Sequence, residues 1–214
     1  MLQSYILSFK IENYKPIPRD VEKLRGYIAS QFQEEVLLHN HQNDFEFRYK
    51  LPLIQYKIIN QQLAIVGYTP QVKPILLSIF DSIQLLNIEG KQYLIKEKNL
   101  RETNDNFAID TKMYNYKFIT PWLALNQENF KLYKEESFDL NKQLQNNILS
   151  NFKDLGIMVN TPIICNGKFE PKPIVLKNVK MVAFTGNFES NVILPNYMGI
   201  GKRKSLGFGT IINL

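Results

Sequence analysis

The change of hydrophobic period along the first 88 residues is the feature that most constrains how this chain can fold. Some segments alternate polar and apolar residues, as half-buried strands do, and others repeat apolar residues every three to four positions, as helices do. Prolines and polar turns separate the segments. The predicted order is a strand at 4–12, a helix at 20–33 capped by Asp20, two or three strands within Phe45–Val66, a helix at Pro70–Ile83 and a strand at Leu85–Ile88.

The first half therefore has the strand and helix order of a ferredoxin-like domain. The second half suggests another unit of similar size, so we expect an α+β protein with two tandem ferredoxin-like (βαββαβ) domains, at 1–88 and 89–214. Its elements are a strand at Tyr93–Ile95, a polar connection at Asn99–Asp110, a strand at Met113–Ile119, a helix at Ser137–Leu155, and strands at Ile157–Ile164, Ile174–Leu176, Val179–Thr185 and Thr210–Leu214.

Composition excludes several kinds of site. The chain has one cysteine, Cys165, and two histidines, so it forms no internal disulfide and no cysteine-rich zinc site. Its first residues lack the basic and apolar regions that are typical of a signal peptide, and no apolar run approaches about 18 residues, so we expect a cytoplasmic protein that uses no membrane. Residues 151–214 carry eight basic and three acidic side chains within a net charge of +6. This asymmetry favours a nucleic acid as partner, although a solvated basic face would look the same.

A glycine-rich segment near the chain end carries the strongest functional signal. It reads Gly199-Ile-Gly-Lys-Arg-Lys-Ser-Leu-Gly-Phe-Gly209, and its spacing is neither that of a P-loop nor that of a Rossmann fingerprint. Glycines permit positive φ and close approach of a ligand, and exposed amides beside cations attract phosphates. The alternative is a tight β-turn packed closely against a helix. The candidate phosphate-binding residues, which become RNA-binding residues under the resemblance described next, are Gly199, Gly201, Lys202, Arg203, Lys204, Gly207 and Gly209.

This pattern resembles the C-terminal glycine-rich loop of the RAMP superfamily, and most closely that of the Cas6 family of CRISPR RNA-processing endoribonucleases. The likeness covers both glycine pairs, the basic insert, Ser205-Leu206 and the place close to the chain end. It implies two ferredoxin-like domains and CRISPR repeat RNA in precursor transcripts as the ligand. Other Cas proteins and a second copy of the chain are further partners that it suggests.

The resemblance also implies a catalytic histidine after the first helix. Leu38-His39-Asn40-His41 has that place; His39 matches the family position, and His41 stays open as the alternative. The family often adds a tyrosine on the first helix and a lysine after the histidine, and Tyr27 and Lys50 fit those places. Two other basic residues compete with Lys50: Arg48 and Lys57.

The chemistry of RNA cleavage explains these residue types. RNA carries its own nucleophile, the 2′-OH, so a histidine with a pKa near ~6.5 can act as base or acid at neutral pH. A cation can stabilise the charge on phosphorus. Neither a metal nor a cofactor is needed for this reaction, and none is expected. For His39 the alternative role is stabilisation of a helix C-terminus through the helix dipole.

Three functions remain open at this level. The first is a metal-independent endoribonuclease that cuts CRISPR repeat RNA and leaves 2′,3′-cyclic phosphate and 5′-OH ends. The second is a non-catalytic RAMP subunit that binds RNA within a CRISPR effector complex. The third is a nucleotide-binding ferredoxin-like domain unrelated to CRISPR, in which the glycine segment holds a small phosphate ligand.

Overall fold

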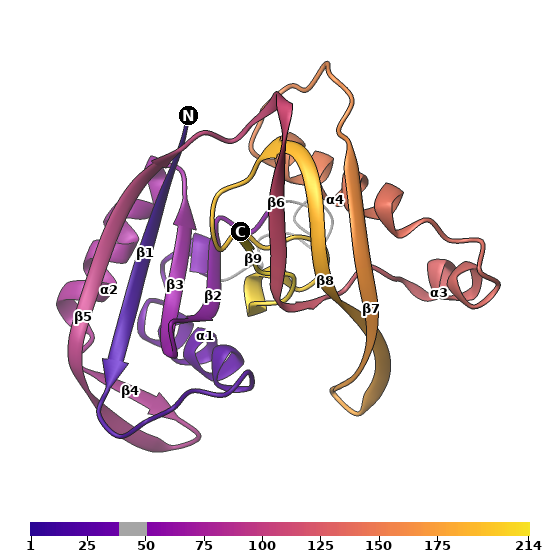
Figure 1. Cartoon of the computed structure of the whole chain (residues 1–214). Helices are drawn as coiled ribbons and strands as arrows, with labels where there is room; N and C mark the ends of the chain where they lie inside the picture. The colour runs from indigo at the N-terminus through magenta and orange to yellow at the C-terminus, as the bar shows by residue number, and fades with distance from the viewer. Residues whose placement is uncertain (39–50) are drawn as a thin grey trace. The chain divides into compact units, whose positions relative to one another are not determined.

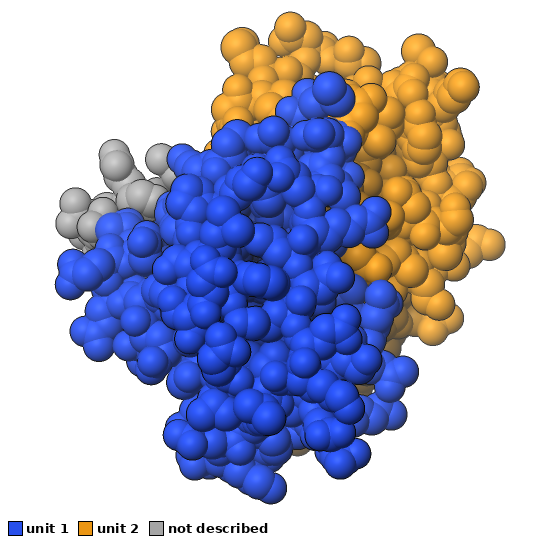
Figure 2. All heavy atoms as spheres, turned by 90° about the vertical axis from the view of Figure 1, so that its left-hand side faces the viewer, with its two compact units in different colours: residues 1–105, 205–207 blue, residues 106–204, 208–214 orange. Residues whose placement is uncertain are grey.

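The computed structural model describes residues 1–38 and 51–214, which form two α+β units (Figure 1). Unit 1 comprises residues 1–105 and 205–207, and unit 2 comprises residues 106–204 and 208–214 (Figure 2). Each unit is built on one antiparallel sheet, as the predicted fold class requires. No helix within the described residues is long and apolar enough to cross a membrane.

Unit 1 follows the predicted order of elements and adds one strand. Its elements are β1 (Leu2–Ile11), α1 (Asp20–Gln31), β2 (Ile54–Ile59), β3 (Gln62–Tyr68), α2 (Lys73–Ser82), β4 (Leu85–Ile88) and β5 (Lys91–Asp105), with short 3₁₀ turns η1 (Val36–Leu38) and η2 (Pro70–Val72). The helices bury apolar residues at three- to four-residue spacing, such as Val21, Leu24 and Ile28 of α1. Asp20 begins α1 instead of capping it, and its carboxylate accepts a hydrogen bond from the Ile17 N–H.

The sheet of unit 1 has the order β2-β3-β1-β5-β4. β2 and β3 form a hairpin whose turn residues, Asn60 and Gln61, both have positive φ, as a type I′ turn requires. β1 pairs antiparallel with β3 on one side and with β5 on the other, so that Leu7 lies opposite both Ile65 and Leu100. Because β1 is central, its alternating pattern is the clearest strand signal in the sequence.

Strand β5 moves the division between the halves from the predicted residue 88 to residue 105. Its side chains are mostly polar and exposed, and only Ile95 is buried, so hydrophobic periodicity does not reveal it. Pairing with β1 from Leu2 to Ile11 nevertheless makes it a full strand. The predicted polar connection at Asn99–Asp110 is therefore wrong over most of its length, whereas the predicted strand at Tyr93–Ile95 lies within β5.

Unit 2 has the same antiparallel sheet order but no α-helix between its last two strands. Its elements are β6 (Ala108–Trp122), α3 (Gln127–Lys134), α4 (Leu140–Asp154), β7 (Cys165–Leu176), β8 (Val179–Ile193), the 3₁₀ turn η3 (Lys204–Leu206) and β9 (Ile211–Asn213). The sheet order β7-β8-β6-β9 corresponds to β2-β3-β1-β5 of unit 1. Residues 194–210, all of them described, fill the connection in which a ferredoxin-like unit has its second helix. The glycine-rich segment lies in this connection.

The core of unit 2 is aromatic. The rings of Trp122 and Phe118 stack with centroids 5.3 Å apart, and Phe188 and Phe184 pack onto them from β8. α4 buries Leu144, Ile148 and Phe152, as its predicted apolar stripe indicates. The predicted strand at Ile157–Ile164 is wrong: this segment is irregular, because the ladder between β7 and β8 begins only at Cys165.

Candidate functional site

The glycine-rich segment forms a closed hairpin, residues 199–209, which we call the glycine hairpin. Its ends meet at the Gly199–Thr210 bridge and at a hydrogen bond of 2.9 Å from the Ile200 N–H to the Gly209 carbonyl. Two further amides hold it to the end of β6, since Gly209 donates to Pro121 and Lys202 donates to Leu123. These amides donate hydrogen bonds to backbone carbonyls within the protein, so they are not available to bind an anion.

Steric fit explains why glycines occur at three of these positions. A Cβ at Gly209, where φ is +61°, would lie 1.9 Å from the carbonyl oxygen of Ile200. A Cβ at Gly201, where φ is +86°, would lie 2.6 Å from Nε1 of Trp122. Gly207, which groups with unit 1, has φ of +81° and would place a Cβ 3.1 Å from the Tyr56 carbonyl. The glycines therefore allow close backbone packing and left-handed conformations that other residues rarely adopt.

The three cations of the glycine hairpin differ in their surroundings. Lys202 is exposed, and its Nζ donates to the Leu125 carbonyl at 3.0 Å; partial burial lowers its pKa. Arg203 is half-buried and has a positive φ of 54°. Lys204 is directed inward: burial lowers its pKa to about 8, and the attraction of Asp154 opposes that shift.

A row of polar side chains on α4 faces this segment and was missed from the sequence. Asn147 accepts a hydrogen bond from the Trp122 indole at 3.1 Å, Asn151 donates to the Gly199 carbonyl at 3.0 Å, and Asp154 lies 3.7 Å from the Lys204 ammonium. Their spacing of four and three residues places them on one side of the helix. The same spacing is present in the sequence beside the apolar stripe of α4, but spacing alone does not show that these polar side chains have buried partners.

Lys202 also lines an open groove in unit 2 with a volume of about 780 Å³. The groove has apolar walls that include Phe130, Pro173 and Met181, and Lys180 is a second cation along it. An ammonium group at such an opening can meet a phosphate without leaving its carbonyl partner, because it has three donors.

The predicted catalytic residues lie mostly outside the described part of the chain. His39, His41 and Lys50, and also the competing Arg48, fall within residues 39–50, so the structure brings none of them together with anything else. Tyr27 lies on α1, half-buried against the core of unit 1. Lys57, the remaining competitor, lies on β2 and is only 1% exposed.

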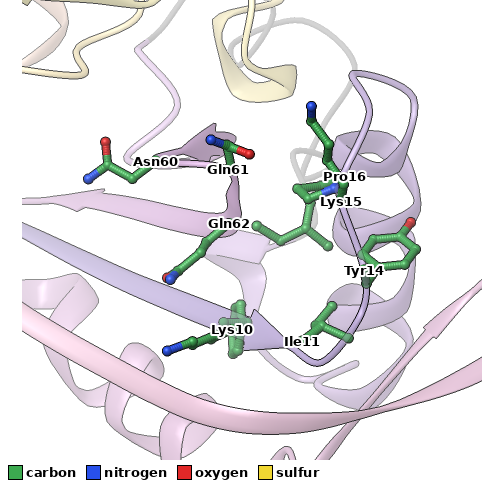
Figure 3. Close-up of a pocket in the computed structure, with 10 residues that line it drawn as sticks. Lys10, Ile11, Tyr14, Lys15, Pro16, Asn60, Gln61 and Gln62 are labelled. Carbon is green, nitrogen blue, oxygen red and sulfur yellow. The ribbon is translucent and has the colours of Figure 1, made fainter.

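A polar pocket of about 320 Å³ opens in unit 1 between the end of β1 and the β2–β3 turn (Figure 3). Lys10 and Ile11 come from β1, Tyr14 and Lys15 from the segment after it, and three carboxamides from residues 60–62. The Lys10 ammonium lies 3.3 Å from a carboxylate oxygen of Glu97. None of the predicted site residues lines this pocket. Among the residues that the structure describes, no group of three or more histidine, cysteine or acidic side chains could hold a metal ion.

Two ferredoxin-like units with a glycine hairpin before the last strand define a protein of the RAMP class. Comparison with known families is more specific. Residues 2–106 match the Cas6b N-terminal domain, and residues 108–214 match the Cas6b C-terminal domain. The chain therefore belongs to the Cas6 family, and both of its halves are of the Cas6b type.

Solved structures agree with this assignment over the full chain. A crystal structure of Cas6b is 35% identical, covers 100% of this chain and 99% of its own, and has a TM-score of 0.90. The structure of a CRISPR RNA processing endoribonuclease, Cas6b, is 31% identical over 100% of both chains, with a TM-score of 0.77. An uncharacterised protein of Methanocaldococcus jannaschii is 35% identical over 139 residues, which are 62% of this chain and 95% of that protein.

Proposed function

We propose that this chain is an endoribonuclease that binds CRISPR repeat RNA in precursor transcripts and cuts it without a metal ion. The observation that carries the proposal is the full-length match, at 31% identity, to a structure described as a CRISPR RNA processing endoribonuclease. The sequence of the glycine hairpin supports the same proposal. It resembles the Cas6 family, and both halves of the chain match Cas6b domains.

The proposed reaction is an internal transesterification. A base removes the proton of the 2′-OH, the 2′-oxygen forms a bond to phosphorus, and the bond from phosphorus to the 5′-oxygen breaks. An acid gives that oxygen a proton, so the products are a 2′,3′-cyclic phosphate and a 5′-OH. We assign the proton transfers to His39, with His41 as the alternative, because imidazole can both accept and donate a proton near neutral pH.

Two further side chains complete the proposed catalytic group. Lys50 stabilises the charge that develops on the phosphorane oxygens. Tyr27 orients the 2′-OH or donates a proton to the leaving oxygen. The half-buried position of Tyr27 on α1 supports this role, because packing against the core restricts where its hydroxyl can lie.

The glycine hairpin is the proposed contact with the RNA backbone. Gly199, Gly201, Gly207 and Gly209 give it its shape, and Lys202 and Arg203 attract phosphates. Lys202 is the best placed of the three cations, since it is exposed at the edge of the groove in unit 2. The inward-directed Lys204 is considered separately below.

End-group analysis with a chelator present tests this function. Purified protein is incubated with 5′-labelled repeat RNA in excess EDTA, and the fragments are identified by mass spectrometry. We expect one cut per repeat, with a 2′,3′-cyclic phosphate on the upstream fragment. Cleavage that appears only when Mg²⁺ is added would contradict the mechanism. Tight binding without cleavage would favour the alternative, a non-catalytic subunit of an effector complex.

A further inference from the structure

We propose that Lys204 is a positioning residue, which with Asn151 and Asp154 of α4 fixes the glycine hairpin in its shape and makes no contact with RNA phosphates. The inference rests on the proposed function, because a fixed hairpin matters only if the hairpin binds a strand. Under this proposal Lys202 and Arg203 of the basic run bind the ligand, and Lys204 stabilises the hairpin that carries them.

Asn151 is the centre of this arrangement. Its side chain is fully buried at 0% exposure, yet both of its polar atoms have partners in the glycine hairpin. Nδ2 donates to the Gly199 carbonyl at 3.0 Å, and Oδ1 accepts from the Lys204 ammonium at 2.6 Å. A single carboxamide therefore joins the first residue of the hairpin to its last cation, and a buried amide that lost either partner would be costly.

Asp154 holds the charge of Lys204 within the protein. Its Oδ2 lies 3.7 Å from the Lys204 ammonium, and the two side chains are only 11% and 12% exposed. Ser150, one turn earlier on α4, hydrogen-bonds to the same carboxylate oxygen at 3.4 Å. A phosphate approaching Lys204 would meet this carboxylate at close range, and the repulsion between the two anions disfavours that contact.

Lys202 shows the contrast two residues earlier. It is exposed, no ion pair to an acidic side chain is described for it, and it lines an open groove together with Lys180 and Glu128. A lysine that binds phosphate needs access to the ligand, which Lys202 has, whereas the Lys204 side chain is mostly buried beside the Asp154 carboxylate. Sequence alone treats these two lysines as equivalent.

Hydrogen exchange without RNA is the first test. We expect Lys204→Met and Asp154→Asn to accelerate exchange of the hairpin amides that the fold now uses, those of Ile200, Lys202 and Gly209. Lys153→Met is the control, because Lys153 is an exposed lysine on α4, beside Asp154, and its loss changes the net charge as Lys204→Met does. If neither Lys204→Met nor Asp154→Asn changes exchange beyond this control, the proposal is wrong.

The salt dependence of RNA binding is the second test. Lys202→Met should lower the slope of log K against log salt by about 0.7, the value for one phosphate contact on a single strand. Lys204→Met should leave the slope unchanged while weakening binding equally at every salt concentration. A slope lowered as much as that of Lys202→Met would overturn the proposal.

Asp154→Asn keeps the test decisive if Lys204→Met does not fold. If Lys204 contacts RNA, removing its carboxylate partner frees the ammonium, and the slope should steepen. If Lys204 positions the hairpin, exchange should rise and binding should weaken with an unchanged slope. Failure of the proposed function would appear differently, as wild-type protein that does not bind repeat RNA while the exchange results still hold.

Discussion

The carbonyl oxygen of Ile200 occupies the space that a side chain at Gly209 would need, since a Cβ built there would lie only 1.9 Å away. The Ile200 N–H also donates to the Gly209 carbonyl, so the two residues are fixed face to face at the neck of the glycine hairpin. Gly209, in the second glycine pair of the motif, is therefore needed for close packing of the protein backbone, whether or not a ligand is bound.

Gly209→Ala should destabilise the protein by about 3 kcal/mol. A left-handed alanine costs about 1 kcal/mol, and the clash with a backbone atom that cannot move freely adds to it. Gly156→Ala is the control, because Gly156 has a similar φ of +70° but no atom within 4 Å of its Cβ position. Urea unfolding measures both variants, and equal losses would show that φ alone, and not the contact with Ile200, explains the glycine.

The low pKa of Lys204 predicts a pH-dependent stability difference. Burial lowers this pKa from 10.5 to about 8, so between these values the unfolded chain holds a proton that the folded chain has released. The free energy of unfolding should therefore rise with pH in that window, by about 3 kcal/mol relative to Lys204→Met. Below pH 8 Lys204 is protonated in both the folded and the unfolded chain. The difference in the free energy of unfolding between wild type and Lys204→Met should therefore not change with pH there.

Urea titrations of wild type and Lys204→Met at pH 7, 8, 9 and 10 measure this difference. Other lysines and tyrosines titrate in the same range in both proteins, so only the difference between them is informative. A difference from Lys204→Met that does not change with pH would mean that Lys204 is not buried as described.

Neutralising Lys202 and Arg203 together should weaken RNA binding and lower its salt dependence. Each phosphate contact on a single strand contributes about 0.7 to the log–log slope, so two lost contacts lower it by about 1.4. Fluorescence anisotropy with repeat RNA from low to high salt gives the slope. Adding Lys204→Met to this double variant should lower it no further, and an unchanged slope in the double variant would show that the glycine hairpin does not contact the RNA backbone.

Replacing His39, the proposed catalytic histidine, should slow cleavage strongly while RNA binding is retained. Proton transfer by a positioned side chain is worth roughly 10²–10⁴-fold, so His39→Ala should slow single-turnover cleavage by about that factor. His41→Ala, measured in parallel, shows whether the second imidazole shares the role. If both variants cut at the wild-type rate, the assignment to this segment is wrong.

Tyr27→Phe should slow cleavage and leave the fold intact. The change removes only the hydroxyl and keeps the ring that packs against the core of unit 1, so the free energy of unfolding should change by less than about 0.5 kcal/mol. Tyr93→Phe is the control, since Tyr93 is another half-buried tyrosine packed against the same core. Equal cleavage rates in the two variants would remove Tyr27 from the proposed catalytic group.

Local patterns predicted well wherever one face of an element is apolar. β1, α1, α2 and α4 all appear near their predicted places, because burial of one face requires a fixed period that is written in the sequence. Only Tyr93–Ile95 of β5 was predicted as a strand. The rest was not, because pairing with β1 makes it a strand and its exposed polar faces carry no period. The predicted strand at Ile157–Ile164 is wrong for the converse reason: β-forming residues make a strand only where they pair with a neighbour, and the ladder between β7 and β8 begins at Cys165.

In the candidate site, too, the sequence predicted local features and missed those that depend on tertiary contacts. The motif at 199–209 was visible as a string of letters, and the family that it suggested is confirmed by both domain matches. The separation of Lys202 from Lys204 was not visible, because it depends on which side of the hairpin faces α4.

The sequence by itself determined that the chain alternates strands and helices in a ferredoxin-like order and ends in a Cas6-type glycine motif, because those properties are local. Only the tertiary structure decided that β5 belongs to the first unit, that the glycines are needed for close backbone packing, and that Lys204 faces Asn151 and Asp154. Each of these depends on contacts between residues far apart in the chain, and no local period or spacing encodes such contacts.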